Sequence, residues 1–294
     1  MRELSRNESL VTEFVLAGLT DCPEFQLPLF CMFLMIYIVT LVGNLGLVTL
    51  IALNSHLHTP MYYFLFNLSY IDLCYSSVFT PKMLMNFISK KNGISYAGCM
   101  IQLCFFLFFV ISECYMLTAM AYDRYVAICN PLLYKITMSQ PVCSGLSLAA
   151  YAMGFAGASA HTGCMLRLTF CSANVINHYL CDILPLLQLS CTSTYVNEVV
   201  VLIVVGINIT VPSVTILISY IFISTSILGK SVQRVRPHCL SRKKTPDCTW
   251  STLSTLMPIV PQESGVLNPL IYSLRNKDVK VALKNVMIKI QSRD

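Results

Sequence analysis

The chain contains 294 residues, of which 55% are hydrophobic and only 12% charged, and its formal net charge is +6. Soluble domains carry about 25% charged residues, so this composition excludes an ordinary soluble enzyme or binding module. Uncharged apolar runs of about 20 residues or more recur along the chain and predict a polytopic helical membrane protein. Most of the 14 cysteines lie inside these runs, where buried thiols are expected rather than disulfides or metal ligands.

The basic residues gather toward the C-terminal end of the chain. Of the 20 Lys and Arg residues, 12 follow Leu228, whereas residues 1–24 carry five acids and two bases. Basic segments stay cytoplasmic, so we expect the N-terminus outside and the C-terminal region inside the cell. The basic residues flank apolar runs, so their positions are explained by the surface of the lipid bilayer. No nucleic acid is therefore expected as a partner.

The first part of the chain is predicted to be an extracellular tail followed by an uncharged span. The tail covers residues 1–24, and Asn7 begins an Asn-Glu-Ser sequon that predicts glycosylation. The span covers about residues 25–53 and contains Asn44. A buried amide in a membrane needs a hydrogen-bonding partner on another helix.

The next two spans each contain one carboxylate. Asp72 lies in the span at about residues 61–80, and Glu113 lies in the span at about residues 98–128. Acids inside a membrane are costly and are functional by default. Two interpretations remain open, a sodium ion bound between the acids or a proton shared between them.

The third span ends in Asp123, Arg124 and Tyr125, where lipid gives way to water. Charged residues at this depth tend to be paired and functional. The alternative is interfacial anchoring, because Arg reaches toward water and Tyr favours the headgroup region.

The fourth span, at about residues 142–166, is rich in Gly and Ala and therefore suited to close helix packing. His161 near its outer end is either a ligand contact or, as we favour, a hydrogen-bonded structural histidine. Residues 167–198 form an outer loop with three cysteines, on the oxidising side where disulfides persist. Together with Cys99 at the mouth of the third span, they allow three connectivities.

The fifth span, at about residues 199–228, is longer than a bilayer requires, so it should tilt or protrude. Residues 229–252 carry six bases and two prolines, which exclude a spanning helix. The longest uncharged run between there and Asn268 has 15 residues and includes two prolines, fewer than the ~18 that a span needs. Residues 253–274 are interpreted as the remnant of a seventh span, and residues 275–294 as an amphipathic tail on the inner leaflet.

The predicted fold is an all-α, polytopic transmembrane bundle of the seven-helix receptor type. It has five clear spans within residues 25–228, a degraded seventh span and no recognisable sixth. Several strings resemble olfactory receptors, a branch of the rhodopsin-like G-protein-coupled receptors, over residues 1–228 and 264–290. These strings are Gly43-Asn44, Leu57-His58-Thr59-Pro60-Met61-Tyr62, Ser112-Glu113-Cys114-Tyr115, Met120-Ala121-Tyr122-Asp123-Arg124-Tyr125-Val126-Ala127-Ile128-Cys129, Ser219-Tyr220 and Asn268-Pro269-Leu270-Ile271-Tyr272-Ser273-Leu274-Arg275-Asn276.

The resemblance implies disulfides Cys99–Cys181 and Cys171–Cys191. It implies a buried polar or cation pocket formed by Asn44, Asp72, Glu113 and Asn268. The residues implied for the switch and for G-protein coupling are Asp123, Arg124, Tyr125, Tyr220 and Tyr272. Helical-face reasoning adds an apolar ligand pocket of Phe106, Leu107, Val110, Ile111, Val204, Val205 and Asn208, for each of which a core or lipid-facing role is the alternative.

The function that the resemblance implies is odorant binding with signalling through a stimulatory, olfactory-type G protein at the plasma membrane. No cofactor is expected apart from the sodium ion. A non-signalling remnant is the first rival, since a lost sixth helix would abolish the cyclic-AMP response and retain the chain in the endoplasmic reticulum. A small channel or transporter is a weaker rival. An enzyme is not expected, because the sequence has no nucleophile–base or metal-ligand constellation.

Overall fold

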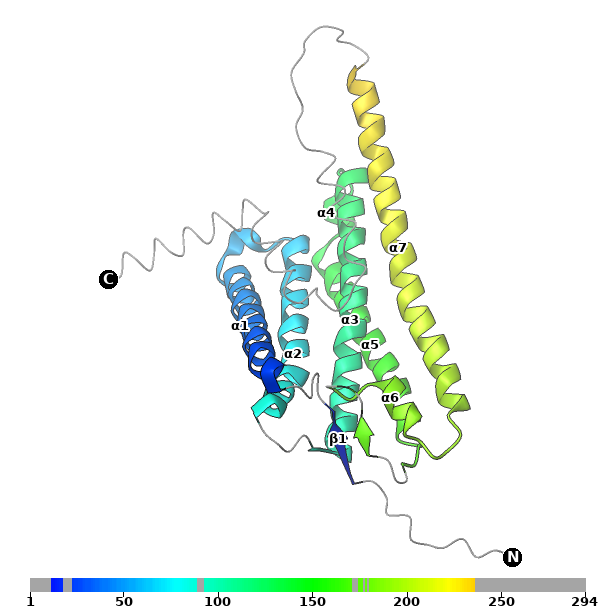
Figure 1. Ribbon diagram of the computed structural model, residues 1–294. Helices are drawn as coiled ribbons and strands as arrows, with labels where there is room; N and C mark the ends of the chain where they lie inside the picture. Colours follow the sequence, from blue (N-terminus) through cyan, green and yellow to red (C-terminus); the bar gives the residue numbers. More distant parts are fainter. Residues whose placement is uncertain are drawn as a thin grey trace, which may run out of the picture.

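The computed structural model describes residues 12–17, 23–88, 93–170, 174–176, 178 and 180–235. Five long helices dominate this part of the chain (Figure 1). They are α1 (Pro23–Leu53), α2 (Pro60–Ile88), α3 (Tyr96–Cys129), α5 (Gln140–Met165) and α7 (Tyr195–Val235). The helix α3 lies at the centre and packs on α2, α5 and α7, whereas α1 packs on α2.

Within the described residues, four helices are long and apolar enough to cross a membrane. They are α1, α3, α5 and α7, with mean hydropathies between 1.3 and 2.4 in their most apolar windows. The helix α2 has 29 residues, which is long enough, but it carries more polar residues. Ser69, Asp72, Ser76 and Thr80 of α2 are buried, so these polar groups face protein rather than lipid.

Short elements join the long helices and set their ends. The 3₁₀ turn η1 (Ser55–Leu57) connects α1 to α2, and α4 (Tyr134–Thr137) lies between α3 and α5. Pro60 begins α2, where its missing N–H costs nothing. The Ser95 hydroxyl caps α3 by accepting a hydrogen bond from the Gly98 N–H at 3.1 Å.

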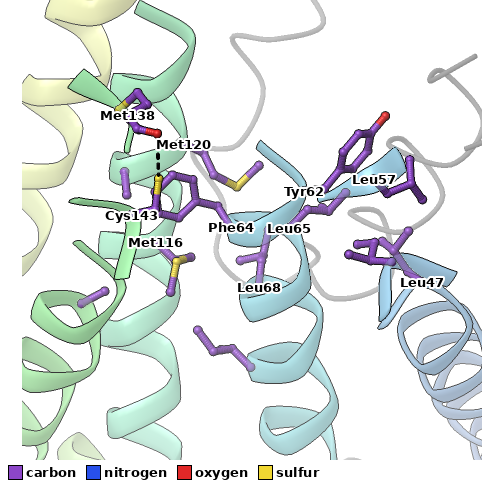
Figure 2. Packing of buried hydrophobic residues seen from close by; sticks show 14 of the residues in the cluster. Leu47, Leu57, Tyr62, Phe64, Leu65, Leu68, Met116, Met120, Met138 and Cys143 are labelled. Atoms are coloured by element: carbon purple, nitrogen blue, oxygen red, sulfur yellow. Dashed lines mark hydrogen bonds between the residues drawn. The ribbon is translucent and has the colours of Figure 1, made fainter. Parts of the chain in front are cut away.

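The half of the bundle that lies next to α4 has a continuous apolar core (Figure 2). Phe64 of α2 projects toward Met116 and Met120 of α3, and Leu65 and Leu68 of α2 belong to the same core. This core also reaches the connection that carries α4, where the Cys143 thiol donates to the Met138 carbonyl at 3.7 Å. The loop after α3 is thereby joined to the start of α5.

A glycine of α5 allows α5 to lie close against α3. A Cβ atom at Gly154 would meet the Ser112 hydroxyl and would lie 2.6 Å from the Phe108 carbonyl oxygen of α3. Since real Cβ atoms essentially never come so close, only glycine fits here without a shift of α3. This contact accords with the close packing expected from the Gly- and Ala-rich sequence of this helix.

A small sheet closes the outer end of the bundle. Its described strands are β1 (Glu13–Leu16), β2 (Gly93–Ser95) and β3 (Val175–Ile176), in the order β2-β1-β3. The pairing is antiparallel for β1 with β2 and parallel for β1 with β3. Phe14 and Leu16 are fully buried against residues of α3 and the outer loop. Two residues of the predicted N-terminal tail, Phe14 and Leu16, are therefore part of the folded core.

The helix α7 is longer than the sequence predicts. It begins at Tyr195 and ends at Val235, whereas a span over about residues 199–228 was expected. Residues 229–235, assigned to an atypical basic segment, continue the helix. Lys and Arg are good helix formers, so the basic residues at the start of this segment do not end the helix.

Several predictions concern residues outside the described part of the chain. They are the glycosylation of Asn7, the roles of Cys171, Asn268 and Tyr272, and the interpretations of residues 236–252, 253–274 and 275–294.

Candidate functional site

The outer loop is fixed over the end of α3 by a disulfide. Cys99 and Cys181 are bonded, with Cα atoms 5.6 Å apart, which confirms the predicted pair. The Cys181 N–H also donates to Gln102 Oε1 at 3.3 Å, so the loop is held at two points on the same helix. Cys191 is disulfide-bonded as well, and its predicted partner Cys171 lies outside the described residues.

Three of the predicted ligand residues meet where α3, α5 and α7 come together. A Cβ at Gly157 of α5 would lie 2.6 Å from the Ile111 side chain, 3.5 Å from Asn208 Nδ2 and 3.7 Å from the Val204 side chain. Ile111 and Asn208 are buried, and Val204 is partly buried. Gly157 was missed by the sequence reasoning, which took the glycines of this helix only as packing residues.

The other predicted ligand residues are distributed around this meeting point. Leu107 is buried on α3, and Val110 is partly buried there. The ring of Phe106 lies 5.6 Å from that of Tyr75, so it packs against α2. Val205 is 37% exposed on the outer surface of α7. The geometry therefore gathers Ile111, Val204 and Asn208 but not Phe106 or Val205.

His161 is buried one turn beyond Gly157 on α5, with 2% of its surface exposed. Among the described residues, no hydrogen-bond partner reaches its Nδ1 atom. The unpartnered atom is Nδ1 alone, so the interpretation of His161 as a hydrogen-bonded structural histidine stays a prediction.

The middle of the bundle contains the predicted polar residues Asn44, Asp72 and Glu113, each at most 3% exposed. The Asn44 amide donates to the Thr40 carbonyl of its own helix at 3.0 Å. Asn268 lies outside the described residues, so convergence of these groups and a sodium ion between the acids remain predictions. In the described part of the chain, no three or more His, Cys, Asp or Glu residues form a group suited to a metal ion.

The inner end of α3 carries Asp123, which is 3% exposed. The Tyr134 hydroxyl of α4 donates to Asp123 Oδ1 at 2.9 Å. Burial first, and then this hydrogen bond to the carboxylate, raise the pKa of Tyr134 above its ordinary value of 10.0. The phenol is therefore a protonated donor at physiological pH. No local pattern in the sequence marks this contact, because the residues are eleven positions apart and join two helices.

The inner ends of α3 and α7 also touch. The rings of Tyr125 and Phe222 lie 5.8 Å apart, and Cys129 Sγ lies 3.1 Å from Ser226 Oγ. Arg124 and Tyr220 are each partly buried on these two helices. The predicted switch residues of the described chain thus lie on α3 and α7, two helices that contact each other at this end.

Comparison with known proteins identifies the family. The olfactory receptor family model matches residues 32–249. The chain is 70% identical to human olfactory receptor 8B3 and 70% identical to human olfactory receptor 8B2, in both cases over 99% of each chain. It is 68% identical to mouse olfactory receptor 8B3, over 99% of this chain and 98% of that receptor.

These matches bear on the basic segment after α7. The family match continues to residue 249, so the interpretation that the resemblance is interrupted directly after Leu228 is corrected. The matches do not support the loss of a sixth helix. The alignments with the human receptors cover 310 positions, more than the 294 residues of this chain, and therefore include positions where this chain has no residue.

The family match is consistent with three features of the structure. They are the helices of membrane-spanning length, the loop bonded to α3 by the Cys99–Cys181 disulfide and the Asp-Arg-Tyr sequence near the end of α3. The chain therefore belongs to the olfactory receptor family, a branch of the rhodopsin-like G-protein-coupled receptors, and is a receptor and not an enzyme.

Proposed function

We propose that this receptor binds a small, mostly apolar odorant between the outer halves of α3, α5 and α7. The observation that carries the proposal is the meeting of Ile111, Gly157, Val204 and Asn208, which combines apolar side chains with one buried amide. Small-ligand sites have this character, with a mainly hydrophobic lining and a few polar groups that fix orientation. The disulfide-bonded loop lies over the outer end of the same helix α3.

The inner end of α3 is the proposed coupling site for a stimulatory G protein of the olfactory type. Asp123, Arg124 and Tyr125 lie there, and Tyr125 packs against α7. A ligand can switch this end only if it favours one of two arrangements of the bundle. The helix α3 reaches both the odorant residues and the coupling residues, so it is the physical connection through which such a shift would pass.

The receptor is proposed to reside in the plasma membrane with its N-terminus outside. The placement of the cysteines supports this orientation, because disulfides persist on the oxidising side of the membrane. The sheet formed by β1, β2 and β3 lies at the same end as the Cys99–Cys181 bond, so the N-terminal strand shares that side.

A receptor that binds odorant but does not signal is the second candidate. It is favoured by the sequence alone, since residues 229–267 contain no apolar run of span length. Coupling requires the helices to separate at the inner end of the bundle. A receptor that lacks the helix that moves could therefore bind odorant without signalling.

One experiment tests both candidates. The full chain, an Arg124→Ala variant and a version with a family-like sixth helix inserted after Val235 would be expressed with surface labelling, and cyclic AMP measured against an odorant panel. We expect a response from the unaltered chain and its loss in Arg124→Ala at equal surface level. A response from the inserted version alone would establish the second candidate. No response from either surface-labelled chain would contradict odorant signalling.

A further inference from the structure

The helices α5 and α7 contact each other, and buried or partly buried side chains of α3, α5 and α7 meet at Gly157. We define the outer seam as Ile111, Gly157, His161, Val204 and Asn208. Above it, Asn197 Nδ2 donates to the Cys164 carbonyl at 3.0 Å and lies 3.6 Å from Met165 Sδ. At its lower end, Asn208 Nδ2 lies 3.5 Å from the Cβ position of Gly157. His161 lies between these levels, one helical turn, or about 6 Å, above Gly157.

Two polar atoms in this seam have hydrogen-bonding capacity that the described residues leave unused. Within that part of the chain, no partner reaches His161 Nδ1 or Asn208 Oδ1, and the two side chains are 2% and 8% exposed. Buried polar groups are normally satisfied, and each exception needs an explanation. The neighbouring Asn197 shows the usual case, since its amide donates to the next helix.

The orientation of the Asn208 amide is fixed by its other end. Its Nδ2 group donates to the Val204 carbonyl at 2.7 Å. If the amide were turned by 180°, Oδ1 would face this carbonyl, and no hydrogen bond could form because both oxygens are acceptors. Oδ1 therefore remains as an acceptor that can be satisfied only by a donor. The neutral imidazole of His161 offers Nδ1 as donor or acceptor, depending on its tautomer.

We propose that His161 and Asn208 form a polar subsite for the hydroxyl group of the odorant, so that this receptor selects small alcohols over carbonyl compounds and ethers of the same skeleton. The inference rests on the proposed odorant function. A hydroxyl both donates and accepts, so it satisfies Asn208 Oδ1 and can also use His161. A ketone, aldehyde or ether cannot donate to Oδ1. Ile111 and Val204 supply apolar contact for the carbon skeleton next to this group.

The test uses two probe pairs of matched skeleton, menthol with menthone and 1-octanol with octanal. Ligand-induced shifts of the thermal unfolding midpoint would be measured on the purified full chain in lipid nanodiscs. These shifts report ligand binding and do not depend on G-protein coupling. We expect the alcohol of at least one pair to bind about tenfold more tightly than its partner, as one well-made hydrogen bond allows.

The variants separate the subsite from general packing. Asn208→Leu should abolish the preference for the alcohol and should leave the unliganded protein at least as stable, because the lost amide bonds only its own helix. His161→Phe should reduce the preference in the same direction. Thr210→Val, on the exposed side of the same helix, should leave it unchanged.

Three outcomes decide the matter. Alcohol preference that disappears in Asn208→Leu supports the subsite. Equal affinity for both members of each pair contradicts the proposed subsite. An alcohol preference that persists in both Asn208→Leu and His161→Phe also contradicts it. Neither result contradicts the proposed odorant function. No stabilisation by any of the four probes or by the odorant panel overturns both.

Discussion

At the scale of single residues, Asp123 shows how a short connection controls a site on a long helix. Its neighbour Arg124 is the residue through which coupling is proposed, yet the carboxylate is bound by Tyr134 from the loop helix α4. A hydrogen bond to a charged group contributes about 1.5–3 kcal/mol. The loop between α3 and α5 thus contributes directly to the orientation of the Asp-Arg-Tyr sequence.

Replacing Tyr134 with Phe removes this hydrogen bond and keeps the ring. We expect a lower thermal unfolding midpoint and higher ligand-independent cyclic AMP, because the buried carboxylate loses a donor that holds the resting arrangement. Tyr122→Phe is the matched control, since that tyrosine is exposed beside Asp123. Equal basal signalling in the two variants at equal surface level would contradict a holding role for Tyr134.

The pH dependence of this contact follows from the raised pKa of Tyr134. The folded-state pKa lies above the ordinary value of 10.0, so the protonated phenol is favoured by folding. Its contribution to stability is therefore fully present below about pH 10 and is lost only as the pH rises through the folded-state value. Between about pH 7 and 9, unfolding curves of the wild type and Tyr134→Phe should differ by a constant amount.

At the scale of elements, the glycines of α5 divide into those that touch another helix and those that do not. Gly154 and Gly157 lie against α3 and, for Gly157, also α7. At Gly145 and Gly163, a Cβ atom would meet nothing within 4 Å. The same residue type therefore serves helix packing at two positions and has no steric role at the other two.

Adding one methyl group distinguishes these positions. Gly154→Ala should destabilise the receptor by about 1–3 kcal/mol, because the Phe108 carbonyl belongs to the backbone and cannot turn aside. Gly163→Ala, in the same helix, should be neutral or slightly stabilising, since alanine has the better helix propensity. Thermal unfolding in nanodiscs measures both, and equal midpoints would show that α3 and α5 separate at no cost.

The helices were predictable from the sequence because lipid requires long uncharged runs, and α1, α3 and α5 begin and end within a few residues of their predicted limits. The end of α7 was predicted too early because the first basic residues were taken as the end of the helix, whereas the helix continues to Val235. The strand β1 was missed because four residues are too short for a periodic signal. Contacts such as Tyr134 with Asp123 join distant positions, and single-sequence patterns do not encode them.

At the scale of the whole molecule, the outer end is a composite of segments far apart in the chain. Phe14 packs edge-on against Phe170, with ring centroids 5.2 Å apart, and against Tyr96 of α3. The N-terminal segment, the loop before α3 and the loop before α7 thus share one core. Stability of the odorant region depends on a strand that precedes the first span.

Separate substitutions of two neighbouring residues of β1 test this dependence. Phe14→Ser should cost about 3–5 kcal/mol, as loss of a fully buried aromatic does, and should reduce surface expression and odorant binding. Val15→Ser changes a side chain that is 37% exposed on the same strand and should have little effect. If limited proteolysis and unfolding midpoints respond equally to both, β1 is not part of the cooperative unit.

The sheet also imposes an order on synthesis of the chain at the ribosome. Val15 pairs with Val175, so about 160 further residues must be made before β1 meets β3. At about 5–20 residues per second, this interval lasts roughly 10–30 s, during which α1, α2, α3 and α5 are inserted. The strand that is synthesised first is thus the one whose last partner is synthesised late. The apolar side chains of Phe14 and Leu16 cannot be fully buried until that loop has been made.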